Sequence, residues 1–120
     1  SMAGGFKIDW HGDEQLTILI KGAGSKVQEQ SAKVVKNNAE LFQRFAKGYA
    51  PHDTGFLKSQ IKTSYPDALE AHIDAEAAYS GYQEYGTRFQ AGKPFMRPAL
   101  KVVEPKFKRD MTNVMKGAFE

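Results

Sequence analysis

The chain of 120 residues contains no cysteine, which excludes disulfide scaffolds, thiol nucleophiles and zinc sites built on thiolates. It lacks an apolar run near the ~20 residues of a membrane span, and its N-terminus lacks a signal-peptide pattern. A glycine-rich phosphate loop, a nucleophile elbow and a His-Glu metal helix are also missing. We therefore expect no membrane association, no cofactor and no enzymatic activity.

The composition that remains is typical of a folded globular protein. Apolar residues make up 41%, charged residues 26% and aromatic residues 12% of the chain. This length is sufficient for a single domain with a modest core, so we assign residues 1–120 to one domain. Ser1-Met2 resembles a cloning remnant before a native start, and residues 1–5 are expected to be disordered or of that origin.

The net charge of +3 hides an uneven distribution of charge along the chain. Residues 65–87 carry five acidic side chains and no lysine or arginine, whereas residues 88–120 carry eight basic and three acidic ones. Two surfaces of opposite charge can meet across a subunit boundary. They can equally be two separate solvated faces, and the charge pattern alone does not decide between these alternatives.

The N-terminal segment predicts one strand and one ambiguous element. Phe6, Ile8 and Trp10 alternate with polar residues, which is the pattern of a half-buried strand. Over 14–21, three apolar residues share one helical face and Asp13 can act as N-cap, which favours a short helix. The dipeptide Thr17-Ile18 gives the same stretch strand character.

A long amphipathic helix of ~23 residues is the clearest element in the sequence. Ser25 and Gln28 form a capping box at its start, and Gly48 with Pro51 predicts its end. Its apolar face, expected to lie in the core, comprises Val27, Ser31, Val34, Val35, Asn38, Leu41, Phe42, Phe45 and Ala46.

Two alternating segments, 61–65 and 69–75, predict a β-hairpin. A register with Tyr65 opposite Leu69 places Lys62 opposite His72. One face of the hairpin is then apolar and packs on the long helix, while the other face is wet and acidic.

A last helix is expected to begin at Pro98, a favourable first helical position. Its apolar stripe comprises Leu100, Val103, Phe107, Met111, Val114 and Ala118. Pro105 lies inside the helix and should kink or break it. The predicted fold class is α+β, with a long N-terminal helix packed on a small antiparallel sheet and followed by a C-terminal helix.

The triplet Asp53-Thr54-Gly55 matches the catalytic triplet of aspartic proteases, but its context differs. No apolar strand precedes the triplet, and Phe56-Leu57 follows it where a small residue is expected. We interpret the segment as a structural turn made by Pro51, Asp53, Thr54, Gly55 and Leu57. The three histidines, His11, His52 and His72, are too scattered to predict a metal site.

Tyrosines recur every third residue between Tyr79 and Tyr85. They can pack in the core or lie at an interface, because phenols tolerate partial hydration. The glycine-containing polar loop 88–93 is a candidate contact loop. The candidate subunit interface comprises Tyr79, Tyr82, Glu84, Tyr85, Arg88, Phe95 and Arg97.

Three segments in order carry a resemblance to a known family. They read APHDTGFLKSQI at 50–61, YSGYQEYGT at 79–87 and PFMRPAL at 94–100. The order and spacing resemble the tail-component family of tailed phages, the "gene product ten" type of coliphage Hong Kong 97. That family reads A-P-x-D-T-G-x-L-x-x-S-I, then Y-A-x-Y-V-E-F-G-T, then P-F-L-R-P-A. Departures include Gln60 between Ser59 and Ile61, and Gln83 in place of valine.

The resemblance implies a virion structural protein of α+β fold, a tail-completion or head–tail joining subunit. Such subunits form a ring, often sixfold, and contact neighbouring connector or tail proteins. They are assembled in the cytoplasm of the bacterial host and lie in the neck of the virion. We expect the acidic region 65–87 to meet the basic region 88–120 of the next subunit in the ring.

Two other functions compete with this interpretation. The basic last helix could make the chain a small nucleic-acid-binding module, with binding that weakens steeply as salt increases. Weak DNA contact is also compatible with a phage connector. A dimeric aspartic protease built on Asp53-Thr54-Gly55 is the least supported alternative.

Overall fold

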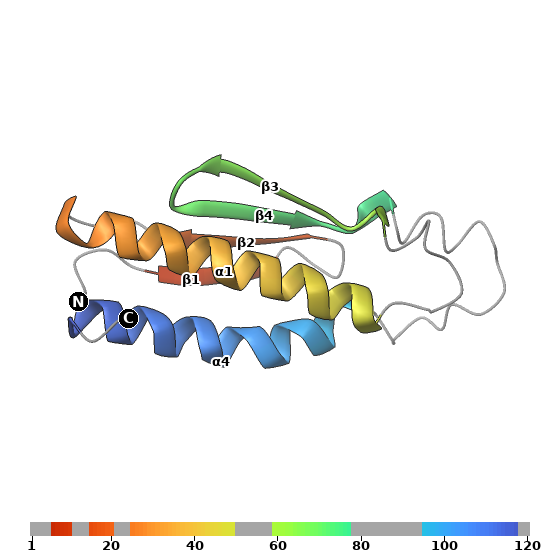
Figure 1. Cartoon of the computed structure of the whole chain (residues 1–120). Coiled ribbons are helices and arrows are strands. Elements are labelled where there is room, and N and C mark those ends of the chain that lie inside the picture. Colours follow the sequence, from red (N-terminus) through yellow and green to blue (C-terminus); the bar gives the residue numbers. More distant parts are fainter. Residues whose placement is uncertain (1–5, 11–14, 21–24, 50–58, 78–94, 118–120) are drawn as a thin grey trace, which may run out of the picture.

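The chain forms two layers, a four-stranded antiparallel sheet and a pair of helices that cover one of its faces (Figure 1). A computed structural model describes residues 6–10, 15–20, 25–49, 59–77 and 95–117. The elements are β1 (Phe6–Trp10), β2 (Gln15–Ile20), α1 (Ser25–Tyr49), β3 (Lys62–Asp67), β4 (Glu70–Asp74) and α4 (Met96–Met115). The strands are ordered β1-β2-β4-β3. The predicted α+β class, with a long helix on an antiparallel sheet and a C-terminal helix, is confirmed.

The short helix predicted over 14–21 is wrong, because residues 15–20 form strand β2 at the centre of the sheet. Ile18 pairs with Ile8 of β1 on one side and with Ala71 of β4 on the other. Leu16, Ile18 and Ile20 are buried at alternate positions, which is the strand period. Pairing with two neighbouring strands satisfies far more backbone groups than a single helical turn could, so tertiary context overrides the local pattern.

The β3–β4 hairpin is present, but its predicted register is wrong by two residues. Lys62 pairs with Asp74 rather than with His72, and Thr63 pairs with Ile73. An irregularity between Ser64 and Asp67 shifts the pairing near the turn. Because the error is an even number of residues, each side chain keeps its predicted face of the sheet. The predicted apolar face of the hairpin therefore still packs on α1.

Helix α1 begins at Ser25 as predicted and ends at Tyr49, one residue beyond Gly48. Its buried residues are Ser31, Val34, Val35, Asn38, Ala39, Phe42 and Ala46. The prediction omitted Ala39 and included Leu41 and Phe45, which are only partly buried. The helix packs against α4 and against β2, β3 and β4. It thus joins the two layers, together with α4, which packs against β1. The side chain of Ser25 lies outside those described, so the capping box stays a prediction.

Helix α4 begins at Met96, two residues before the predicted start, and continues through Pro105 without a break. The Pro105 ring is exposed, and Lys101, whose carbonyl loses its partner, also lies on the solvent side of the helix. Water can therefore satisfy that carbonyl, which explains why the predicted break does not occur. The buried face of α4 comprises Met96, Ala99, Val103, Phe107, Met111 and Val114. The predicted stripe member Leu100 is only partly buried, and Ala118 lies outside the described residues.

Candidate functional site

Most of the candidate residues from the sequence lie outside the described part of the chain. These are the turn residues Pro51, Asp53, Thr54, Gly55 and Leu57 and the interface residues Tyr79, Tyr82, Glu84, Tyr85 and Arg88. His11 and His52 lie outside it as well. The turn and the aromatic interface therefore stay predictions.

The two described interface candidates, Phe95 and Arg97, have different environments. Phe95 is 4% exposed and belongs to the hydrophobic core of its own chain. Arg97 is exposed, and its guanidinium carbon lies 5.5 Å from the ring centroid of Trp10 on β1. A guanidinium at this distance makes a favourable contact with the electron-rich face of an indole. Arg97 thus links the first turn of α4 to the edge strand of the sheet.

Burial explains why several positions of the third motif, 94–100, are apolar. Phe95, Met96 and Ala99 are buried, so these positions anchor the first turn of α4 against the core. Pro98 lies in that turn, where backbone N–H groups have no helical partner and a proline is tolerated. Phe95, Met96 and Ala99 therefore stabilise the fold of the chain itself.

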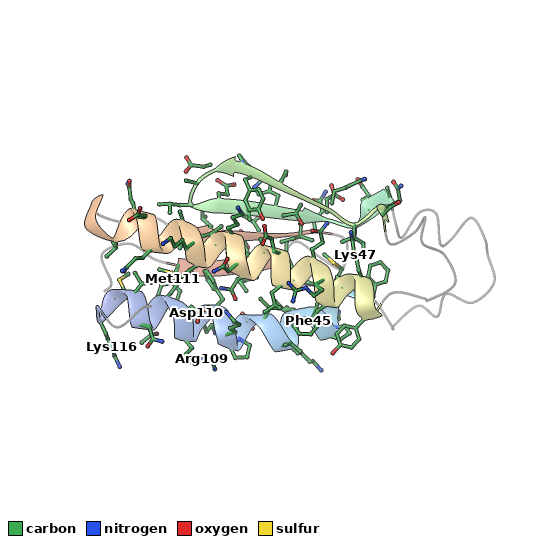
Figure 2. All side chains as sticks on the ribbon, viewed as in Figure 1. Phe45, Lys47, Arg109, Asp110, Met111 and Lys116 are labelled. Atoms are coloured by element: carbon green, nitrogen blue, oxygen red, sulfur yellow. The ribbon has the colours of Figure 1, made fainter. Side chains whose placement is uncertain are left out.

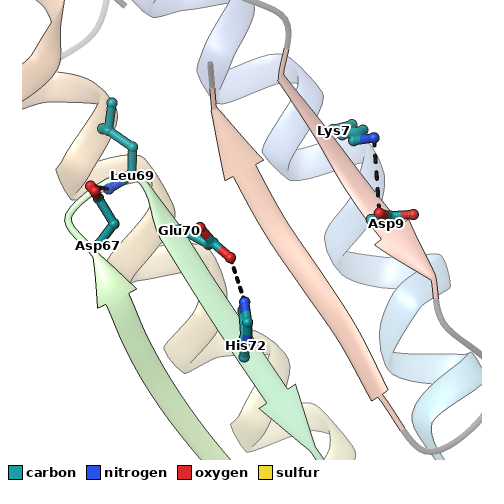
Figure 3. Close-up of polar contacts among 6 residues, drawn as sticks. All are labelled: Lys7, Asp9, Asp67, Leu69, Glu70 and His72. Atoms are coloured by element: carbon teal, nitrogen blue, oxygen red, sulfur yellow. Dashed lines mark hydrogen bonds and ion pairs between the residues drawn. The ribbon is translucent and has the colours of Figure 1, made fainter. Parts of the chain in front are cut away.

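The sheet face that points away from the helices is polar (Figure 3). On β4, Glu70 Oε2 lies 2.5 Å from His72 Nε2, and on β1 Lys7 Nζ lies 3.9 Å from Asp9 Oδ2. Asp74 accepts hydrogen bonds at both carboxylate oxygens, from Gln15 Nε2 at 3.1 Å and from the backbone N–H of Glu76 at 2.8 Å. The ionisable groups of β4 thus already have partners within the subunit.

A shallow hollow of about 300 Å³ lies on this polar face. Its walls are formed by Gln15, Leu16, Thr17, Ser64, His72, Ile73 and Asp74. His72 and Asp74 are both engaged in the contacts described above, and Ser64 lies opposite His72 in the register of the hairpin. Within the described residues, no three His, Asp or Glu side chains gather in a way that could hold a metal ion.

A polar cluster crosses the interface between the two helices. Asn38 is fully buried, and its Nδ2 donates to the Val34 carbonyl at 2.9 Å and to Asp110 Oδ2 at 3.1 Å. The same Asp110 oxygen accepts from Lys106 Nζ at 2.6 Å. Asp110 lies between α1 and α4 in Figure 2. Because buried polar groups require partners, the cluster fixes how the two helices pack along their length.

Charge separates between the layers of the fold. Helix α1 carries five basic and two acidic residues, and α4 also carries five and two. The four strands together carry two basic and four acidic residues. The asymmetry seen along the sequence thus becomes a cationic helix layer behind a weakly anionic sheet. The sequence could not give this pattern, because the placement of α1 beside α4 was not predicted.

Partial burial and a neighbouring carboxylate raise the pKa of Tyr65, which is still 43% exposed, above its ordinary value of 10.0. Burial is the larger cause, and the negative charge of Glu40 on α1 adds to it. The folded protein therefore holds the phenol proton more tightly than the unfolded chain does. The resulting stabilisation is complete below pH 10 and is lost as pH rises above this value.

We expect Tyr65→Phe to reduce the fall in stability that the protein undergoes above pH 10. Glu40→Gln should move the phenol pKa only part of the way back to 10.0, because burial remains. The shift is measured by titrating the phenolate absorbance of the wild type and of Glu40→Gln. The absorbance of the Tyr65→Phe protein is subtracted, so that only Tyr65 contributes. An unchanged midpoint in Glu40→Gln would refute the electrostatic contribution.

Neither described helix is long and apolar enough to cross a membrane. Comparison of the chain with profiles of protein families, with curated protein sequences and with solved structures found no match. The class that the fold defines is a two-layer α+β domain with a cationic helix layer.

Proposed function

We propose that the chain is a structural subunit in the neck of a tailed phage or prophage, a tail-completion or head–tail joining protein. The observation that carries the proposal is the succession of three motifs at 50–61, 79–87 and 94–100, in the order and spacing of the phage tail-component family. The α+β architecture, with a long helix on an antiparallel sheet and a C-terminal helix that begins within the third motif, agrees with the fold that this resemblance implies.

The proposed subunit acts by assembly rather than by catalysis. In a head-to-tail ring, each subunit presents two different surfaces to its neighbours. The aromatic segment from Tyr79 to Tyr85 is proposed to supply part of this contact, together with Arg88 and Arg97. The proposal also includes partners above and below the ring, namely the connector and tail proteins of the same particle.

A nonsense codon placed at Lys33, early in α1, tests the proposal in the phage or prophage that carries the gene. We expect electron microscopy of the lysate to show filled heads and separate tails, because the joining subunit is missing. The same phage grown in a suppressor strain is the control and should yield joined particles. Joined, infectious particles in the non-suppressing strain would contradict the proposal.

The order of genes around the reading frame provides a second test. Portal, protease and capsid genes upstream and a major tail gene downstream would support a neck protein. A position within a metabolic operon would contradict it.

A further inference from the structure

The solvent-exposed face of α4 is basic along most of its length. Apart from Arg97, which contacts Trp10, its exposed cationic side chains are Lys101, Lys108 and Arg109, and Lys116 follows just after the last helical residue. At 100° per residue these four fall within about a third of the helix circumference, and they span ~22 Å at 1.5 Å per residue. Figure 2 shows Arg109 and Lys116 on the side of α4 that points away from α1. This set is called the basic face below.

The acidic residues of α4 do not neutralise the basic face. Asp110 is turned toward α1, where it is bonded to Asn38 and Lys106. Glu104 is partly buried and lies 4.0 Å from Lys108 in an (i, i+4) pair. A partly exposed pair of this kind contributes little free energy. The basic face therefore keeps most of its positive charge for an external partner.

A polyanion fits the basic face better than the acidic surface of a second copy does. The strands supply only four acidic residues, and Asp67, Glu70 and Asp74 already accept hydrogen bonds within their own subunit. Helix α1 adds further positive charge to the same layer instead of compensating it. Phosphates spaced along a nucleic-acid duplex supply the dense negative charge that this surface can neutralise.

The neutral residues of the basic face indicate how a duplex would be contacted. The other exposed residues of α4 are Val102, Pro105, Thr112 and Met115. The exposed residues of α4 thus include no aromatic ring on which unpaired bases could stack, and the helix's one amide side chain for reading base edges, Asn113, is partly buried. Contacts with phosphates position a protein without reading sequence.

We propose that the basic face of α4 binds the phosphate backbone of a nucleic-acid duplex without sequence preference. The inference rests on the charge and exposure of α4 and is independent of the three motifs that support the neck function. A chain with no role in a virion would still show this binding, and a neck subunit could lack it.

Charge-reversal variants of equal net charge test the proposal. Lys101→Glu with Arg109→Glu changes the basic face, while Lys7→Glu with Lys62→Glu makes the same change on the sheet layer. Binding to labelled duplexes of DNA and of RNA is measured by fluorescence anisotropy between about 20 and 200 mM salt. We expect wild-type binding in the range of about 10⁻⁴–10⁻⁶ M that is typical of non-specific contacts.

The basic-face variant should bind each duplex at least about tenfold more weakly than wild type. The slope of log K against log salt concentration should fall in magnitude by about 2. The sheet variant should remain close to wild type. Circular dichroism checks that both variants fold. If the basic-face variant does not, glutamine replaces glutamate at all four positions, so that the two variants keep equal net charge. Comparison of the affinities for the DNA duplex and for the RNA duplex identifies which of the two is preferred.

Three results would overturn the inference. The first is equal weakening by both variant pairs, because binding would then follow net charge alone. The second is the absence of binding to either duplex at the lowest salt. The third is a basic-face variant that loses self-association in sedimentation while its duplex binding is unchanged, because the face would then be a protein interface.

Discussion

Phe107→Ala is expected to lower the free energy of unfolding by about 3–5 kcal/mol. Phe107 is fully buried in α4, and its ring meets that of Phe6 on β1 edge to face, with centroids 5.9 Å apart. Removing the ring leaves a cavity between the C-terminal helix and the first strand. A small domain has only about 5–15 kcal/mol of stability in total, so a large share is lost.

Urea unfolding followed by circular dichroism measures this loss. Val102→Ala is the matched control, because Val102 lies on the same helix but is 41% exposed. The free energy of unfolding of the Val102→Ala protein should stay within about 0.5 kcal/mol of the wild-type value. A Phe107→Ala protein that loses less than about 1 kcal/mol would show that α4 is not packed against β1 in the way described.

Asn38→Asp is expected to cost about 3 kcal/mol at neutral pH, because it places a second carboxylate against Asp110 in the helix interface. Asn38 Nδ2 now donates to Asp110 Oδ2 at 3.1 Å, and the substitution replaces this donor with an acceptor. Lys106 can neutralise one of the two charges but not both. The loss should shrink at low pH, where one carboxylate binds a proton and becomes a donor.

The second substitution Asp110→Asn provides the control for this experiment. In the double variant the donor and the acceptor exchange places across the interface, and one negative charge remains near Lys106. We expect the double variant to recover more than half of the stability lost by Asn38→Asp alone, as a double-mutant cycle would report. Equal losses in the single and double variants would refute a direct contact between these two side chains.

Elements with a strong, long-range period were predictable from the sequence. Helix α1 shows this best, because its apolar residues recur over seven turns. The omission of one of them, Ala39, therefore did not change the prediction of a helix. Strand β2 shows the opposite case, because six residues fit either period and pairing partners decided the outcome. Its neighbours in the sheet, β1 and β4, are far apart in the sequence.

The errors of detail also have physical causes. The β3–β4 register depends on an irregularity near Ser64, and alternation of apolar and polar residues cannot reveal it. Pro105 would break a buried helix, but its exposure could not be deduced before the packing of α4 was known. The link between Asn38 and Asp110 was likewise hidden, since it joins residues 72 positions apart.

The burial of a candidate functional residue could not be predicted from its motif. Phe95 was assigned to a subunit interface from its motif, and the structure shows it buried in the core of its own chain. A motif identifies residues under a common constraint but does not say whether that constraint is folding or assembly. The cationic helix layer emerged only when α1 and α4 were placed side by side.

Quantitative mass spectrometry of purified virions tests the neck assignment most directly. We expect peptides of this chain in intact particles, at a fixed ratio to the portal protein and resistant to washing with high salt and nuclease. The same ratio should persist across independent preparations. Particles that are complete and infectious but contain no peptide of the chain, while the lysate contains it in quantity, would contradict the account.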